Sequence, residues 1–357
     1  MKMRNRHMAK FASGLLLFTV LAMGSQLAAY GEPRYPVLDS KFPAAEAKLG
    51  WLDNERVMFH GYEVGKVGRP SPDDGHPMAE TGLFIWDTSQ NNITKYWDID
   101  GITPLCLFHD QVWMLLRIKG DEKARLLVSG KLGHEQQIKT MGEGALNGVS
   151  CRYYTPKPEW ADERRVRRAL LEEHGYLDFG PWSNPDRSDA ARILFYRKAE
   201  KEPITLPLNP NHVLNLFEYV EFENAYLLES RRQTTYAAPV WLFKPDGTVT
   251  KIFEPTGKKW ERMGWGHYQL TKKGLFLVGG TGKYDQVGTT GGYLLSGDEP
   301  KRIVPGFVRN VSVSPNGCKI VFVHALHSQA EADSVKALRE GKPGTRTLQM
   351  IDLCKGE

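Results

Sequence analysis

The stretch SVSPNGCKIVFVHA, from Ser312 to Ala325, reads as two short strands joined at Pro315-Asn316-Gly317. A short apolar run beside turn residues is consistent with a buried β-strand, and Pro, Asn and Gly are favoured in tight turns. The stretch therefore predicts a β-hairpin. Cys318 begins its second strand, and a further strand, TRTLQMIDL, ends at Cys354.

The positions of the four cysteines predict disulfides rather than a metal site. Antiparallel neighbours bring the start of one strand opposite the end of the next, with Cα atoms about 4.5 to 5.5 Å apart, which suits a Cys318–Cys354 bond. Cys106 and Cys151 fall in the first strands of successive units, where they either pair or remain as two buried thiols. No CxxC spacing is present, and an even cysteine count in an exported chain favours disulfides over zinc.

The N-terminal segment has the layout of a secretory signal peptide. Its first ten residues carry four basic residues and no acid, and the apolar run Phe11 to Met23 follows, with small residues before cleavage after Ala29 or Gly31. We therefore expect residues 1–31 to be a signal peptide and residues 32–357 to form one periplasmic or secreted domain. The alternative is an uncleaved membrane anchor. No later run approaches the roughly 20 apolar residues of a membrane-spanning helix, so the mature chain should have no transmembrane segment.

Removal of the leader also removes most of the net charge. The full chain has 47 Lys and Arg against 42 Asp and Glu, a formal charge of +5, and residues 1–31 contribute four of these positive charges. A nearly balanced mature chain has little attraction for a polyanion. We therefore expect no nucleic acid partner.

The remaining sequence repeats a pattern of short strands and polar turns. Six units of about 50 residues, each with three or four alternating strands, predict an all-β fold: a six-bladed β-propeller of four-stranded antiparallel blades. The sixth unit lacks a fourth strand. The segment YPVL, Tyr35 to Leu38, is the candidate to complete it, because an open ring would leave two unpaired sheet edges.

The stretch SVSPNGCKIVFVHA followed by TRTLQMIDL resembles the repeat of TolB-like propellers, whose blades read SPDG and then two apolar strands. Asn316 stands where that repeat has Asp, and WLDNERVMFHGYE in the first unit is a looser match. The resemblance covers about 45 residues closely and implies a six-bladed propeller. It implies no activity, because such repeats occur in binding proteins, assembly factors and enzyme appendages.

Motifs for catalysis and cofactor binding are missing from the sequence. There is no GxSxG, HExxH or EF-hand loop, and GGTGKY, Gly279 to Tyr284, lacks the spacing and the Ser or Thr of a phosphate loop. We expect neither a cofactor nor a metal. One alternative is that His60, His324 and His327, which end second strands of the first and last blades, converge on a metal. Ordinary rim histidines explain the same positions.

Long connections between second and third strands predict a binding face. They span Gly61 to Glu80, Thr281 to Gly291 and Leu326 to Gly344, and such connections emerge on one face of a propeller. Tolerated surface variation is the alternative interpretation. Together with the three histidines, the candidate residues of this face are Arg231, Arg232, Tyr236 and Tyr284.

A second insertion interrupts the third blade. Glu159 to His174 carries a narrow apolar stripe with helical spacing and predicts one inserted helix over about residues 159–174. It either docks a partner or lies across its own blade.

The sequence favours a non-catalytic binding or scaffold protein whose loop-rich face meets a protein or glycan partner. The alternative is an enzyme, a polysaccharide lyase or hydrolase with a histidine-lined site at the channel mouth.

Overall fold

The protein is built almost entirely of β-strands. The computed structural model describes residues 35–70, 77–98, 105–108, 111–117, 125–130, 137–141, 168–170, 175–178, 194–197, 202–206, 213–231, 239–255, 266–279, 290–297, 299–326, 333 and 336–355. In these ranges no helix is long and apolar enough to cross a membrane.

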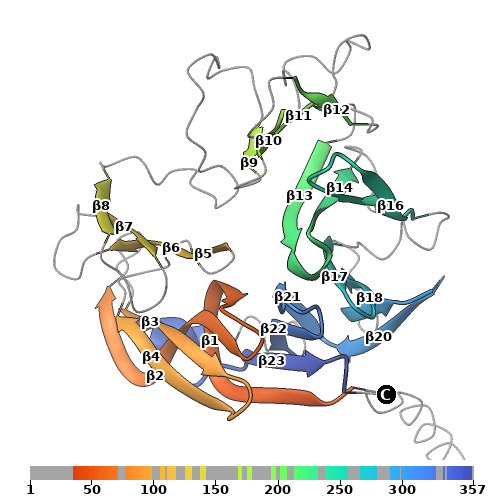
Figure 1. Cartoon of the computed structure of the whole chain (residues 1–357). Coiled ribbons are helices and arrows are strands. Elements are labelled where there is room, and N and C mark those ends of the chain that lie inside the picture. The colour runs from red at the N-terminus through yellow and green to blue at the C-terminus, as the bar shows by residue number, and fades with distance from the viewer. Residues whose placement is uncertain are drawn as a thin grey trace, which may run out of the picture.

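The strands form one seven-stranded sheet and four four-stranded sheets, all antiparallel (Figure 1). The seven-stranded sheet has the order β21-β22-β23-β1-β2-β3-β4. Its strands are β21 (Phe307–Val313), β22 (Lys319–Ala325), β23 (Thr347–Asp352), β1 (Val37–Trp51), β2 (Arg56–Pro70), β3 (Pro77–Asp87) and β4 (Asn92–Asp98). Strand β1 belongs to two groups of four, one at each end of the chain.

The other four sheets follow the chain order. The first contains β5 (Leu105–Phe108), β6 (Gln111–Arg117), β7 (Arg125–Gly130) and β8 (Gln137–Met141). The next contains β9 (Arg168–Leu170), β10 (Gly175–Asp178), β11 (Leu194–Arg197) and β12 (Ile204–Thr205). The last two contain β13 (Val213–Val220), β14 (Ala225–Arg231), β15 (Val240–Phe243) and β16 (Val249–Phe253), then β17 (Gly266–Thr271), β18 (Gly274–Gly279), β19 (Gly291–Leu295) and β20 (Pro300–Pro305). A short 3-10 helix, η1 (Glu221–Glu223), joins β13 to β14.

The sheets pack face to face because alternate residues of one strand enter different cores. Leu275 and Leu277 of β18 pack against the β13–β16 sheet, whereas Phe276 and Val278 pack against the β21–β23 group. These residues are at most 4% exposed, and burial of each such side chain is worth about 1.5 to 3 kcal/mol. Four-stranded sheets that pack successively through both faces are the blades of a β-propeller.

Strand β1 joins the last blade to the first. Val37 and Leu38 pair with Ile351 and Met350 of β23, and the far end of the strand pairs with β2, where Trp51 faces Val57. The pairing predicted for the YPVL segment is therefore confirmed at Val37 and Leu38. Closure of a whole wheel also needs a seam between the β5–β8 and β9–β12 sheets, which no described core cluster spans. The ring of six blades stays a prediction.

Strand β1 changes direction at Lys41, which has a left-handed φ of 55°. The backbone N–H of Lys41 donates to Asp39 Oδ1 at 2.7 Å, and that of Phe42 donates to Ser40 Oγ at 3.1 Å. Such local bonds compete with strand pairing. The two side chains thus accept hydrogen bonds from the backbone N–H groups of Lys41 and Phe42. This part of β1 is the outer strand of the last blade, where unpaired N–H groups could pair with another chain and cause aggregation.

A second contact fastens the same two blades at their turns. Lys319 is 8% exposed, and its Nζ donates to Asn54 O at 3.0 Å and to Glu55 Oε2 at 2.6 Å. The backbone N–H of Asn316 donates to the side-chain Oδ1 of Asn54 at 2.9 Å. A buried cation is stable only when paired, so Lys319 ties the turn after β21 to the turn after β1.

The predicted Cys318–Cys354 disulfide is present. The Sγ atoms are 2.11 Å apart and the Cα atoms 5.3 Å apart, and the Leu353 amide donates to Cys318 O at 2.8 Å. The bond therefore lies at the end of the β22–β23 ladder. Cys106 belongs to β5, and Cys151 lies outside the described residues, so their pairing stays a prediction.

Two sequence expectations differ from the structure. Residues 168–170 of the predicted 159–174 helix form strand β9 instead, where Leu170 pairs with Tyr176, because pairing with β10 overrides a local helical pattern. The rest of that segment lies outside the described residues. The predicted loop from Gly61 to Glu80 is largely strand, since β2 continues to Pro70 and β3 begins at Pro77.

Replacing both Cys318 and Cys354 by Ser should lower the free energy of unfolding by about 3 to 4 kcal/mol, because the bond closes a loop of 36 residues. Urea denaturation measures the loss. As the control, the reduced wild-type protein should match the double variant. A variant as stable as the oxidised protein would contradict the expectation.

Candidate functional site

The first blade carries a β-ribbon that extends past the rest of its sheet. Strands β2 and β3 pair regularly from Arg56 opposite Asp87 to Tyr62 opposite Thr81 and, after register shifts, again at Val67 opposite Ala79. Strand β4 pairs with β3 only from Gly82 onward in the described part of the chain. A two-stranded ribbon is marginally stable alone and needs other contacts.

The last blade supplies those contacts through its connection between β22 and β23. Residues 336–340 of this connection are helical and end in Gly341, which has a φ of 63°. The Lys342 amide donates to Ala337 O at 2.8 Å, and the Gly341 amide to Leu338 O at 3.4 Å. These bonds are the Schellman motif, whose left-handed residue is usually glycine.

Three contacts join the ribbon to the helical turn. The Gly65 amide donates to Gly341 O at 2.9 Å, and Tyr62 Oη donates to Lys342 O at 3.0 Å. The Tyr62 ring, 1% exposed, packs on Leu338, 8% exposed. We call residues 62–66, 333 and 336–346 the hairpin–helix unit. Two connections that lie 280 residues apart at the Tyr62–Lys342 contact are therefore built into one structure.

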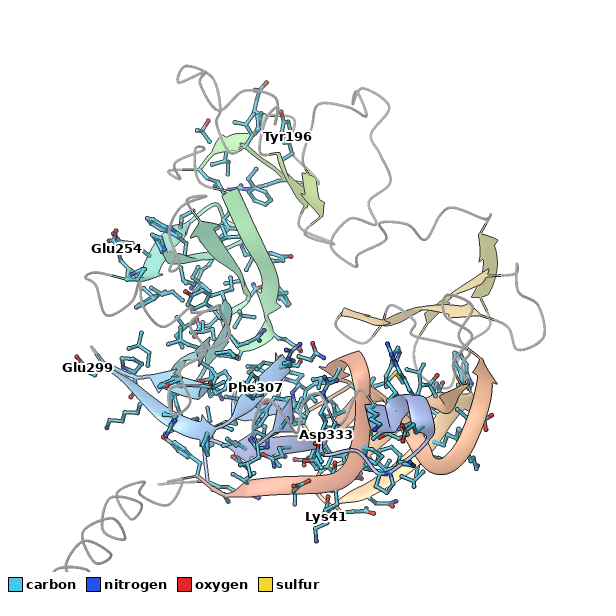
Figure 2. The ribbon with its side chains drawn as sticks, turned by 180° about the vertical axis from the view of Figure 1, so that it is seen from behind. Lys41, Tyr196, Glu254, Glu299, Phe307 and Asp333 are labelled. Carbon is cyan, nitrogen blue, oxygen red and sulfur yellow. A yellow bond between two sulfur atoms is a disulfide. The ribbon has the colours of Figure 1, made fainter. Side chains whose placement is uncertain are left out.

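The helical turn lies on the side of the first blade that faces away from the last blade. Val57 and Phe59 share a core with β22 and β23, and a Cβ on Gly61 would point the same way, toward Phe42. Tyr62 alternates with these residues and so lies on the opposite face. The connection from β22 thus passes over the first blade, and Figure 2 shows the helical segment at Asp333 beside the strands of that blade.

The interior of the unit contains a polar group, the Tyr62 hydroxyl, which feels the charge of the buried Arg346. Burial raises the pKa of Tyr62, while the charge of Arg346 and the Gly344 amide oppose this rise. Arg346 is 3% exposed. The guanidinium keeps its proton, so its charge favours the ionised form of the Tyr62 hydroxyl, although burial is the larger effect.

The exterior of the unit is charged. Glu63 forms ion pairs with Lys66 and, at 3.6 Å, with Lys95, and the hydrogen bond from Lys66 lowers the pKa of Glu63. Glu340 pairs with Lys342 at 2.6 Å and with Lys336 at 3.9 Å, and Lys342 likewise lowers the pKa of Glu340. All six side chains are at least partly exposed, so each pair adds little stability.

The structure separates the two described histidines of the predicted site. His60 is 2% exposed in β2, opposite Leu83, while His324 lies in β22, opposite Thr347. Strands β23 and β1 lie between β22 and β2 in the sheet. No group of three His, Cys, Asp or Glu that could hold a metal occurs among the described residues, and His327 lies outside them.

His324 has a defined partner. Its Nε2 lies 2.8 Å from Pro305 O, which fixes the ring under the connection from β20 to β21. Because the carbonyl accepts, Nε2 carries the proton. Burial lowers the pKa of His324, whereas the Pro305 hydrogen bond and the charge of Asp39 oppose the shift. The ring is therefore held neutral as part of the fold.

The other predicted residues of the binding face are not tested by the structure. Arg231 ends β14, opposite Val213, and only its backbone is described. Arg232, Tyr236 and Tyr284 lie outside the described residues, as does most of the Thr281 to Gly291 connection.

Sequence reasoning missed the helical turn and Tyr62. A signal for the turn was available, since the segment ADSVKALREGKPG combines helix formers with Gly341 as a stop and Pro343 just after it. No sequence signal gives the contact between Tyr62 and Lys342, because it depends on how two blades meet.

Comparison with known proteins gives likeness of fold alone. No family model and no curated protein matches the chain. Among solved structures, the β-propeller domain of the trilobed protease from Pyrococcus furiosus is 11% identical, with a TM-score of 0.37, over 78% of this chain and 90% of that chain. An oligogalacturonate lyase in complex with manganese is 11% identical, with a TM-score of 0.39, over 91% of this chain and 94% of that chain. YCF48 bound to D1 peptide is 9% identical, with a TM-score of 0.38, over 91% of this chain and 96% of that chain.

This chain spans half the length of another similar structure, the acylaminoacyl peptidase of Pyrococcus horikoshii. At such identities and scores, the activities of these proteins say nothing about this one.

Replacing Tyr62 by Phe should loosen the unit without unfolding the blade. The Lys342 carbonyl loses its donor, which costs about 1 to 2 kcal/mol. Hydrogen exchange at the Gly65 amide should accelerate about tenfold. Tyr219→Phe is the matched control, since it removes the hydroxyl bond to Asn224 in another blade. Equal Gly65 exchange in both variants would contradict the structure.

The stability of the fold should depend on the protonation of His324. The folded pKa lies below the unfolded value of about 6.5, so this neutral ring stabilises the protein fully above that pH. The stability is lost as the pH falls through the folded pKa. Between about pH 7.5 and pH 5, urea denaturation should show a larger loss for wild type than for His324→Gln. If the free energy of unfolding fell equally with pH in both proteins, the lowered pKa of His324 would be refuted.

Proposed function

We propose that this chain is an exported, non-catalytic propeller that binds a protein partner through the hairpin–helix unit. One observation carries the proposal. Connections from the first and last blades are joined by the Gly65–Gly341 hydrogen bond, and the ribbon beside this bond exposes Val64. A rigid pair of insertions with an exposed apolar side chain is the kind of surface that proteins use for recognition.

A protein partner is favoured over a glycan. Sugar rings stack on exposed aromatic side chains, and the aromatic residue of the unit, Tyr62, is 1% exposed. The ribbon at residues 62–66 instead exposes main-chain groups, the Glu63–Lys66 ion pair and the aliphatic side chain of Val64. They suit contact with a polypeptide.

The enzyme alternative finds less support. A histidine that transfers a proton must touch the substrate. His60 is 2% exposed, and His324 Nε2 is taken by Pro305 O. We therefore assign both rings to the fold. Export rests on the leader at residues 1–31 and is part of the proposal.

Photo-crosslinking in the native cell tests the proposal. A photoreactive amino acid placed at Val64, 49% exposed, should yield one discrete protein adduct. The matched position is Val37, 43% exposed, at the outer edge of the last blade. It should yield no such adduct. Equal adducts at both positions would overturn the assignment of the face.

Two further results bear on the other parts of the proposal. The mature N-terminus should follow Ala29 or Gly31, and an intact leader would contradict cleavage and export. Turnover of polysaccharide fragments by wild type, lost in His324→Ala while the fold is retained, would replace the scaffold with the lyase or hydrolase.

A further inference from the structure

The hairpin–helix unit presents cations further into solvent than carboxylates. The exposed fractions of the Lys66, Lys336 and Lys342 side chains are 55%, 75% and 68%. Those of Glu63 and Glu340 are 28% and 35%. Arg339 and Asp333 are also exposed. The described residues of the unit carry five cations, with Arg346 buried, against three carboxylates, so the net charge of the unit is positive.

An apolar side chain stands among these cations. Val64 precedes Gly65, and Lys342 follows Gly341, so both flank the 2.9 Å bond between Gly65 N and Gly341 O. Lys66 follows on the same ribbon. Val64, which is 49% exposed, and Lys66 thus flank Gly65 in the chain, and the backbone bonded to Gly65 leads to Lys342, so the unit combines an apolar anchor with positive charge. A complementary ligand carries an apolar side chain between carboxylates.

We infer that the partner segment bound by the hairpin–helix unit is an acidic polypeptide with an apolar residue that covers Val64. The inference rests on the proposed function and adds the chemistry of the partner. Charge complementarity of this kind speeds association and weakens with salt, whereas the valine contact resists salt. The other source of clustered carboxylates, an acidic polysaccharide, provides no aliphatic side chain for Val64.

Peptide binding to the mature protein tests the inference. The probe is a fluorescent peptide of repeating Glu-Leu-Glu-Glu, compared with peptides in which Gln or Lys replaces Glu. Fluorescence anisotropy should give an affinity about tenfold higher for the Glu peptide than for the Gln peptide at low salt, falling as salt rises. The Lys peptide should not bind.

Charge reversal locates the binding surface. The variant Lys336→Glu with Lys342→Glu should weaken binding of the Glu peptide by about tenfold. The control is Lys244→Glu with Lys272→Glu, which makes the same change of net charge at two exposed lysines of other blades. Val64→Ser should weaken binding more than Val37→Ser. Equal effects of the two charge reversals would overturn the inference.

The remaining outcomes separate this inference from the proposed function. Polygalacturonate binding that depends on Lys336 and Lys342, without peptide binding, would replace the polypeptide with a polysaccharide. An adduct at Val64 with a partner that lacks an acidic segment would keep the proposed function and refute the inference. If Val64 gives no protein adduct and the Glu peptide does not bind, both the proposed function and this inference are refuted.

Discussion

The rest of the molecule depends on a strand that belongs to two blades. Strand β1 completes the last blade by pairing with β23 and then begins the first blade by pairing with β2. Without it, β23 would have an open edge and the first blade would lack its innermost strand. Around this shared strand the core of Trp51, Phe59, Val321 and Met350 assembles, so backbone pairing and apolar burial fasten the same junction.

The hairpin–helix unit is a product of that junction. Its two parts come from the two blades that β1 joins, and its contacts start at Tyr62, where β2 extends past the rest of its sheet. The unit also holds the first blade from its far side, while β22 and β23 hold the near side. A surface of this kind is preorganised, so a partner would pay little entropy to order it.

The sequence predicted the strands and the disulfide because both depend on local spacing. The continuous apolar run in KIVFVHA is typical of a strand buried on both faces: Ile320 and Phe322 enter one core, and Val321 and Val323 enter the other. Cys318 and Cys354 followed from strand direction alone. The candidate site was harder to predict, because the long Gly61–Glu80 connection looked like a loop. Its Gly and Pro content hid a ribbon that only contact with another blade supports.

The contact between β1 and β23 also constrains the order of events during biogenesis. Gln349 and Asp39 are hydrogen-bonded across 310 positions of the chain, and the disulfide lies three residues before the C-terminus. The pairing of β1 with β23 cannot form until both strands have been synthesised. Pairing over this distance is slow to form. The junction between the first and last blades is therefore a late event in folding, and the blades between them are synthesised before it can form.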